Sequence, residues 1–205
     1  MEQKSVKMAF TDIYNNNVWG RGSGTGSLPE NNLVYMNYLS EFLKKNNVKS
    51  VIDFGCGDWQ FSRYIDWTGV NYLGVDVVDS VVQANNEKFA NENISFQTVP
   101  DLADLPECDL IISKDVLQHL PLGDIHANLA ALRAKSKYML ITNDVYPDKW
   151  TNVEIEPGGC RSLRFDLPPF SMTAPVVFSW AFISYGNFVE KRTYLMMGDL
   201  MQNND

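Results

Sequence analysis

Residues 51–62 read VIDFGCGDWQFS, an apolar run that ends in Asp53 and a glycine-rich turn. This pattern predicts a buried parallel strand that passes through a tight turn into a helix over about residues 59–66. Gly55 and Gly57 carry no Cβ, so the backbone can turn sharply there and a ligand can lie against it. The predicted site therefore lies at the carboxyl end of the strand, where open α/β sheets bind their ligands.

A second acid follows at the spacing of a nucleoside-binding site. The next strand-like run covers residues 71–76 and ends in Asp76, 21 positions after Gly55. An acid about 20 residues after such a turn binds ribose hydroxyls in dinucleotide folds. NAD would also need a third glycine, which is missing after Gly57, and Asp58 would repel its pyrophosphate. An NAD-linked oxidoreductase is thus the weaker interpretation, and a cofactor with a positive centre and no phosphate fits better.

The segment Asp53-x-Gly55-x-Gly57 resembles the first motif of the class I S-adenosylmethionine (SAM) dependent methyltransferases, which reads acid-x-G-x-G. The resemblance covers about residues 49–142. It implies that SAM is the cofactor, that these three residues hold its methionine end and that Asp76 binds the ribose. Further cofactor contacts expected from the resemblance are Trp19 or Trp59 near the sulfonium, Val77, Leu102 and Lys114.

Asp101 follows the strand-like run at residues 94–98. The matching position in the family accepts a hydrogen bond from the adenine amino group, so the resemblance implies that role for Asp101. Asp is also a favoured residue at the N-cap of a helix. Both roles stay open at this point, and they are compatible with each other.

Strand-like and helix-like segments alternate along the chain. Strands are predicted at residues 49–54, 71–76, 94–98, 109–113 and 138–142, and helices at 29–46, 59–66, 79–91 and 122–135. Such alternation predicts a doubly wound parallel sheet. Gly186-Asn187 joins strand-like runs at 176–185 and 188–197 into a hairpin. We therefore expect residues 1–205 to form a single Rossmann-like α/β domain, with a mostly parallel seven-stranded sheet and a C-terminal antiparallel hairpin.

Composition narrows the classes of partner and compartment. The chain has a formal net charge of −8, which argues against a nucleic-acid partner because such proteins need a basic surface. No apolar run is long enough to span a bilayer. The first ten residues lack an apolar signal core, and the three cysteines form neither a disulfide framework nor a zinc pattern. These features predict a cytoplasmic protein.

Residues 1–30 precede the predicted sheet and contain the tract GRGSGTGS at residues 20–27. A flexible linker is one interpretation of this tract. The other is a lid, because its N–H groups and hydroxyls can form an anion-binding nest and Trp19 stands directly before it. In related methyltransferases the N-terminal segment closes over the cofactor, so the resemblance favours the lid.

The segment SKDVLQHLP at residues 113–121 resembles the V-L-x-H-L segment of small-molecule methyltransferases. Asp115 and His119 are four residues apart and would share one face of a helical turn. An imidazole held by a carboxylate suits the removal of a proton from an attacking hydroxyl. His119 is therefore the candidate general base with Asp115 beside it, and Asp144 is the reserve candidate. The alternative is that Asp115 and His119 only cap and pack the turn.

Metal-dependent O-methyltransferases bind Mg²⁺ with an acid after the fourth strand and an Asp-Asn pair after the fifth. In this chain the acid would be Asp115, but the pair runs Asn143-Asp144, in the reverse order. Oxygen ligands from the three residues would suit Mg²⁺. The reversed order nevertheless favours a site without a metal, and no metal is expected.

Residues 145–172 lack helical periodicity, and a long irregular stretch in a compact domain is usually functional. The segment combines Trp150 with arginines and carboxylates, a mixture that suits a hydroxyl-rich ligand such as a sugar. It also resembles a subgroup of methyltransferases from glycan assembly. Expected acceptor contacts are Arg161, Arg164 and Asp166. The alternative is a loop held to the domain by its own salt bridges.

The sequence thus predicts a SAM-dependent methyltransferase whose acceptor is a sugar hydroxyl in a glycan. The chain is also a candidate part of a larger glycan-assembly polypeptide. Two alternatives remain: an O- or N-methyltransferase for another small metabolite, and a SAM-binding module without catalysis. A panel of acceptors distinguishes the first, and the absence of any S-adenosylhomocysteine product distinguishes the second.

Overall fold

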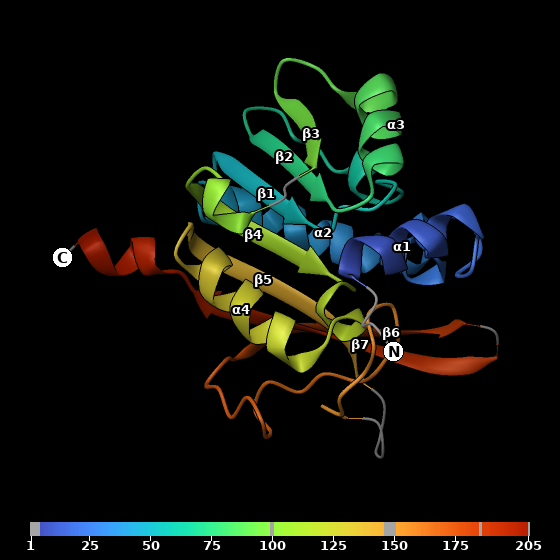
Figure 1. Ribbon diagram of the computed structural model, residues 1–205. Helices are drawn as coiled ribbons and strands as arrows, with labels where there is room; N and C mark the ends of the chain where they lie inside the picture. The colour runs from blue at the N-terminus through green and yellow to red at the C-terminus, as the bar shows by residue number, and fades with distance from the viewer. Residues whose placement is uncertain (1–4, 99–100, 146–150, 185, 205) are drawn as a thin grey trace.

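The computed structural model describes residues 5–98, 101–145, 151–184 and 186–204. Its centre is a seven-stranded sheet with the strand order β3-β2-β1-β4-β5-β7-β6 (Figure 1). The strands are β1 (Ser50–Phe54), β2 (Asn71–Asp76), β3 (Ile94–Thr98), β4 (Cys108–Lys114), β5 (Ser136–Val145), β6 (Val176–Ser184) and β7 (Asn187–Met197). β1 to β5 are parallel, and β7 runs antiparallel to both β5 and β6. The predicted fold class is confirmed.

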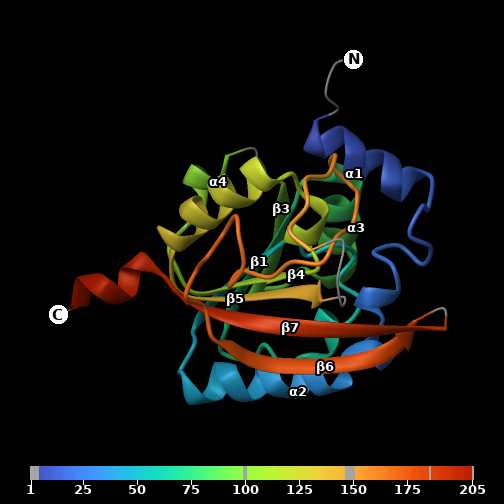
Figure 2. The ribbon, with the colours of Figure 1, turned by 90° about the horizontal axis from the view of Figure 1, so that it is seen from below.

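The sheet separates two apolar cores. The α-helices are α1 (Val6–Asn15), α2 (Pro29–Lys45), α3 (Asp79–Phe89) and α4 (Leu122–Arg133). Side chains of α2 and of residues 59–70 cover one face of the sheet, whereas α4, α1 and residues 163–172 cover the other. Figure 2 shows α2 and α4 on opposite sides of the strands. Because both faces are covered, the middle residues of the central strands are apolar, as in other parallel sheets.

Helix α1 forms within the N-terminal segment, for which the sequence predicted only an extension. Ser5 caps it, since the Ser5 hydroxyl accepts a hydrogen bond from the Met8 N–H at 3.3 Å. Ala9 and Phe10 are the buried side chains of α1, and Phe10 belongs to the same core as α4. This apolar stripe is what docks the N-terminal segment onto the domain.

The helix predicted over residues 59–66 is replaced by a turn and the short 3₁₀ helix η2 (Ser62–Tyr64). Trp59 adopts a left-handed backbone conformation with φ of 56°. Its ring is buried, and its Nε1 donates a hydrogen bond to the Tyr72 hydroxyl at 2.8 Å. A helix from residue 59 could not keep this conformation, so burial of the Trp59 ring overrides the local helical pattern.

Four further 3₁₀ helices connect the main elements: η1 (Thr25–Ser27), η3 (Leu102–Asp104), η4 (Leu117–His119) and η5 (Asp199–Asn204). The parallel strands end together, so the residues that follow β1, β2, β4 and β5 meet at one edge of the sheet. Among the described residues, no helix is long and apolar enough to cross a membrane.

Candidate functional site

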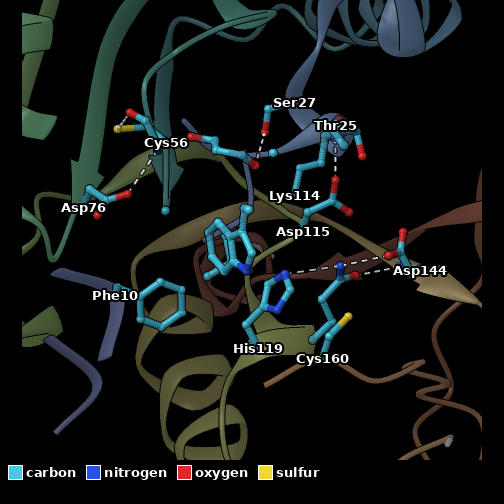
Figure 3. A pocket seen from close by; sticks show the side chains of 18 of the residues that line it. Phe10, Thr25, Ser27, Cys56, Asp76, Lys114, Asp115, His119, Asp144 and Cys160 are labelled. Atoms are coloured by element: carbon cyan, nitrogen blue, oxygen red, sulfur yellow. Dashed lines mark hydrogen bonds and ion pairs between the residues drawn. The ribbon is translucent and has the colours of Figure 1, made fainter. Parts of the chain in front are cut away.

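A polar cavity of about 210 Å³ lies at the carboxyl ends of the parallel strands. It brings together nine residues that the sequence placed in the site: Trp19, Asp53, Gly55, Gly57, Asp76, Lys114, Asp115, His119 and Asp144. Figure 3 shows Asp76 on one wall of this cavity and His119, Cys160 and Asp144 on another, with Lys114 and Asp115 between them. The sequence motifs thus converge on one pocket although they are far apart in the chain.

A second, more apolar cavity of about 260 Å³ adjoins the first. Phe10, Gly55, Asp76 and Val116 line both cavities. Two residues predicted to contact the cofactor, Val77 and Leu102, line the apolar cavity instead of the polar one. The site therefore has a polar part and an apolar part that meet at Gly55 and the Asp76 carboxyl group.

The glycine turn after β1 leaves no room for side chains. Gly55 has φ of 76°, and a Cβ on it would come within 2.3 Å of the Val116 side chain. Gly57 also has a positive φ, and its N–H donates a hydrogen bond to the Asp76 carboxylate at 3.0 Å. Asp76 accepts a second one from the Val78 N–H at 3.0 Å. These contacts fix Asp76 at the junction of the cavities, and burial raises its pKa.

Asp53 lies in β1, two residues before Gly55, and its side chain is buried. It accepts hydrogen bonds from the Tyr72 hydroxyl at 2.6 Å and from the Ser62 hydroxyl at 3.4 Å. Burial raises the pKa of Asp53 to about 6, although these donors and Lys114 oppose the shift. The carboxylate is therefore held by protein donors on one side and lines the polar cavity on the other.

The glycine-serine tract lies directly over the polar cavity. The Ser23 hydroxyl donates a hydrogen bond to Asp58 at 2.6 Å and accepts one from the Asp58 N–H at 3.0 Å. The Tyr14 hydroxyl is 2.6 Å from the same serine oxygen, and Lys114 Nζ reaches the Gly26 carbonyl at 2.9 Å. Trp19 and this tract together form the wall of the cavity that the N-terminal segment contributes. Such fixed contacts are not those of a flexible linker.

We expect Ser23→Ala to loosen this wall, because the substitution removes the hydroxyl shared by Tyr14 and the Asp58 carboxylate. Backbone amides of residues 16–28 should exchange with solvent about tenfold faster or more, given that a hydrogen bond to a charged group contributes about 1.5–3 kcal/mol. Hydrogen exchange with mass spectrometry measures the change. Ser40→Ala is the control, since Ser40 bonds only the Met36 carbonyl of its own helix. Unchanged exchange in Ser23→Ala would mean that the Ser23 hydroxyl does not hold the glycine-serine tract in place.

Four charged side chains form an alternating chain along the bottom of the polar cavity. Lys114 donates to Asp115 Oδ2 at 2.6 Å, and Lys191 donates to Asp115 Oδ1 at 2.7 Å and to Asp144. Asp144 and Lys191 are direct partners in the β5–β7 register, which explains their contact. Burial alone would raise the pKa of Asp115, but the two ammonium groups outweigh it and lower that pKa to about 2.

This arrangement bears on the metal hypothesis. The Lys191 ammonium group lies between the Asp115 and Asp144 carboxylates, where a cation shared by them would bind. Asn143 does not line the polar cavity. Within residues 5–98, 101–145, 151–184 and 186–204, no group of three His, Cys, Asp or Glu side chains is suited to hold a metal ion.

His119 lies on the cavity wall opposite the glycine turn. Its Nδ1 is 2.7 Å from the Gly159 carbonyl oxygen, and its Nε2 is 3.4 Å from Gln118 Nε2. The Trp19 ring packs on the imidazole with a centroid separation of 4.9 Å. Burial lowers the pKa of His119, against the opposing effects of the Gly159 carbonyl and of the Asp115 and Asp144 carboxylates. The neutral imidazole is therefore the form present at neutral pH.

The predicted pairing of Asp115 with His119 on one helical face is wrong. Asp115 has a left-handed conformation with φ of 60°, and the turn that follows is the 3₁₀ helix η4. Residues four apart do not stack in this geometry. Asp115 instead binds the two lysines, and the backbone carbonyl of Gly159 takes the place of a carboxylate beside the imidazole.

Two residues expected to contact the cofactor lie outside both cavities. Trp59 packs in the core that α2 covers, as described above. Asp101 is exposed, and its carboxylate caps η3 by accepting a hydrogen bond from the Ala103 N–H at 2.9 Å. The N-cap interpretation of Asp101 is therefore confirmed. Its neighbour Leu102, by contrast, reaches the apolar cavity.

Residues 151–172 form no helix and lie on the same side of the sheet as α4 and α1 (Figure 2). Gly158 and Gly159 contact His119, and Cys160 lines the cavity. The three predicted acceptor contacts do not line it: Arg161 is only 1% exposed, and Arg164 pairs with Asp166, its Nε lying 2.9 Å from the Asp166 carboxylate. The Arg164–Asp166 pair lies within the segment and does not join it to the rest of the domain. Trp150 lies outside the described residues.

Several pocket residues were missed by sequence reasoning: Tyr14, Ser23, Gln118, Cys160 and Lys191. Lys191 had a signal, since it occupies a buried position of β7 between Val189 and Thr193, where a charge needs a partner. Ser23 also had a signal, because it belongs to the glycine-serine tract proposed as an anion-binding nest, whereas Gln118 had none, since polar side chains in turns are usually exposed.

A family model described as a methyltransferase domain matches residues 31–154, more than half of the chain. This chain belongs to the methyltransferase domain family. The matched region contains the glycine turn, Asp76, Asp115, His119 and Asp144. A search of curated proteins gives no significant match.

Solved structures confirm the fold. The magnesium protoporphyrin IX methyltransferase from Synechocystis with bound SAM is 17% identical, with a TM-score of 0.63 over 95% of this chain and 99% of that chain. The 1,6-didemethyltoxoflavin-N1-methyltransferase from Burkholderia thailandensis, bound to its acceptor and S-adenosylhomocysteine, is 15% identical, with a TM-score of 0.65 over 94% and 87%. The cofactor expected from the sequence is the one that these neighbours carry.

The two cavities fit SAM. The polar cavity offers Asp53 and the N–H groups and hydroxyls of the tract to an ammonium and a carboxylate group. Asp76 at the junction suits ribose hydroxyls, and the apolar cavity between Val77 and Leu102 suits the flat adenine ring. Because Gly55 and Asp76 line both cavities, one ligand can extend from the polar cavity into the apolar one.

Proposed function

We propose that this methyltransferase transfers the SAM methyl group to a hydroxyl oxygen of a small acceptor, with His119 as the general base. The observation that carries the proposal is the neutral imidazole in the polar cavity, fixed through Nδ1 by the Gly159 carbonyl. A hydroxyl must lose its proton as its oxygen attacks, and an imidazole with a pKa near or below neutrality can take that proton. An amine acceptor has less need of such a base.

Each residue of the site has a role in this proposal. SAM, when bound, supplies a methyl group on a positively charged sulfur. Asp53, Gly55, Gly57 and Asp76 orient it, and Trp19 closes the cavity and holds the imidazole in place by stacking. Lys114, Asp115, Lys191 and Asp144 form a rigid polar floor, so the acceptor meets fixed dipoles and not mobile water. Positioning of this kind supplies much of the rate in a displacement reaction.

A sugar hydroxyl is the acceptor that we favour. Its support is the pairing of aromatic and hydrogen-bonding groups in one small cavity: Trp19 and Phe61 with Gln118, Asp144 and Lys191. Aromatic rings pack on apolar sugar faces, and the polar groups bind hydroxyls. In this proposal Cys160 replaces Arg161, Arg164 and Asp166 as the contact from the 145–172 segment, and the N-terminal 30 residues act as the lid.

Calorimetry and an acceptor screen test the proposal. The protein should bind SAM and not NAD, and Asp76→Ala should weaken SAM binding by about tenfold to a hundredfold, since it removes a charged acceptor for the ribose. Asp79→Ala, a change at an exposed acid of α3, is the control. S-adenosylhomocysteine release is then measured with sugars, phenols and amines. Release with amines alone would contradict a hydroxyl acceptor, and no SAM binding would overturn the whole proposal.

A further inference from the structure

The side chain of Gln118 is locked in one orientation. It is buried, its Oε1 accepts a hydrogen bond from the Asp144 N–H at 2.7 Å, and its Nε2 donates to Asp144 Oδ2 at 3.1 Å. A flipped amide would set its oxygen against the carboxylate and its NH₂ group against the N–H. The partners therefore determine which end of the amide faces His119, and that end is Nε2.

The protonation of His119 follows from its two neighbours. The Gly159 carbonyl oxygen can only accept, so Nδ1 carries the proton in the 2.7 Å contact. The other ring nitrogen, Nε2, faces an NH₂ group at 3.4 Å, which can only donate. A neutral imidazole with a bare Nε2 satisfies both contacts, whereas an imidazolium would place one N–H against another.

We infer that Gln118 is a positioning residue, which holds His119 in the Nδ1-protonated neutral form and keeps the Nε2 lone pair available to the acceptor. The inference rests on the proposed role of His119 and adds the group that prepares it. The 3.4 Å contact is long, so an acceptor hydroxyl can replace the amide as the hydrogen-bond partner of Nε2 at little cost, and the amide itself stays bound to Asp144. Asp144 acts through Gln118 as its anchor and not as a second base.

Other charged groups face the imidazole from neighbouring elements. The carboxylates of Asp115 and Asp144, at the ends of β4 and β5, favour the protonated ring, whereas Lys191 from β7 disfavours it. Cys160 stays a thiol near neutral pH, because burial raises its pKa to about 11. Gln118 is the side chain in hydrogen-bond range of Nε2 among the described residues, so its amide acts on the ring nitrogen that takes the proton.

Nitrogen NMR of the imidazoles tests this inference without acceptor or cofactor. The chain has only two histidines, and His126→Gln assigns the signals. Long-range ¹H–¹⁵N spectra of the wild-type protein should show His119 as the Nδ1–H tautomer. Gln118→Met has similar volume but no donor, so it removes the hydrogen bond that favours the neutral ring. In this variant the pKa of His119 should rise and the Nε2–H tautomer should become populated.

Two results would overturn the inference. One is a proton on Nε2 of His119 in the wild-type protein, a measurement that needs no variant to fold. The other is a folded Gln118→Met variant in which the tautomer and the pKa of His119 stay unchanged, which would mean that the Gln118 amide does not act on the ring. Failure of methyl transfer with the Nδ1–H tautomer intact would instead count against the proposed function alone.

Discussion

Methyl transfer by His119→Gln is expected to fall by about 10²–10⁴-fold, the usual contribution of a general base. Glutamine keeps the polarity and much of the volume of the imidazole but cannot accept a proton from a hydroxyl. The SAM dissociation constant should change less than the rate, since the proposed SAM contacts, the glycine turn and Asp76, lie on the opposite wall. Rates with saturating SAM and the best acceptor of the screen give the comparison.

The matched control is His126→Gln, which removes the second histidine from the exposed side of α4. It packs on Phe170, well outside the polar cavity, and its loss should leave the rate within about twofold. Equal losses in both variants would contradict a base at His119. Recovery of the His119→Gln rate at saturating SAM would also contradict it, because the defect would then be in SAM binding.

The pH dependence gives a second check on the same residue. Burial lowers the folded pKa of His119 below the ordinary 6.5, so the neutral base persists as the pH falls to that value. The rate should therefore drop on the acid side only below about pH 6.5, as the ring becomes protonated. In Gln118→Met, where the pKa of His119 is expected to rise, this acid limb should move to higher pH. An acid limb above pH 6.5 in the wild-type protein would contradict the buried neutral imidazole.

The sequence could place part of the pocket lining because the spacing that determines it is local. Gly55, Gly57 and Asp76 act through backbone geometry and spacing along two adjacent strands, which the chain itself records. The acceptor side is different, since it is built from turns that meet only in the folded domain. The Gln118 amide is fixed by Asp144 from another strand, and Ser23 reaches Asp58 over 35 positions.

The errors have one common origin in side-chain burial. The pattern at residues 59–66 is helical, but the Trp59 ring gains more by entering the core than the chain loses by breaking the helix. Likewise the Asp115–His119 spacing suggested a helical face, whereas the buried lysines draw Asp115 into a left-handed conformation. Local pattern predicted the order of elements, and tertiary contacts decided the turns between them.

Lys191→Met is expected to lower the free energy of unfolding by about 3–5 kcal/mol, which is the cost of breaking a buried ion pair from one side. Lys191 is buried and donates to both Asp115 and Asp144. Methionine fills similar space, so the loss comes from two carboxylates left without their shared cation and not from a cavity. Chemical denaturation measures the change. The control is Lys137→Met, which removes the partly exposed pair with Asp109 and should cost about 0–1 kcal/mol.

The sign of the pH effect separates this electrostatic explanation from simple loss of packing. In the wild-type protein the pKa of Asp115 is lowered to about 2 from 3.8, so its contribution to stability is present above pH 3.8 and is lost as the pH falls through 2. In Lys191→Met the Asp115 carboxylate keeps Lys114 but loses its second ammonium partner, so burial raises its pKa and the folded state gains stability as the pH falls. The difference in the free energy of unfolding between the wild-type protein and Lys191→Met should therefore narrow steadily from pH 7 to pH 4. A difference that stays constant over that range would mean that Lys191 stabilises the fold through its aliphatic chain, and the rigid charged floor of the acceptor site would lose its main support.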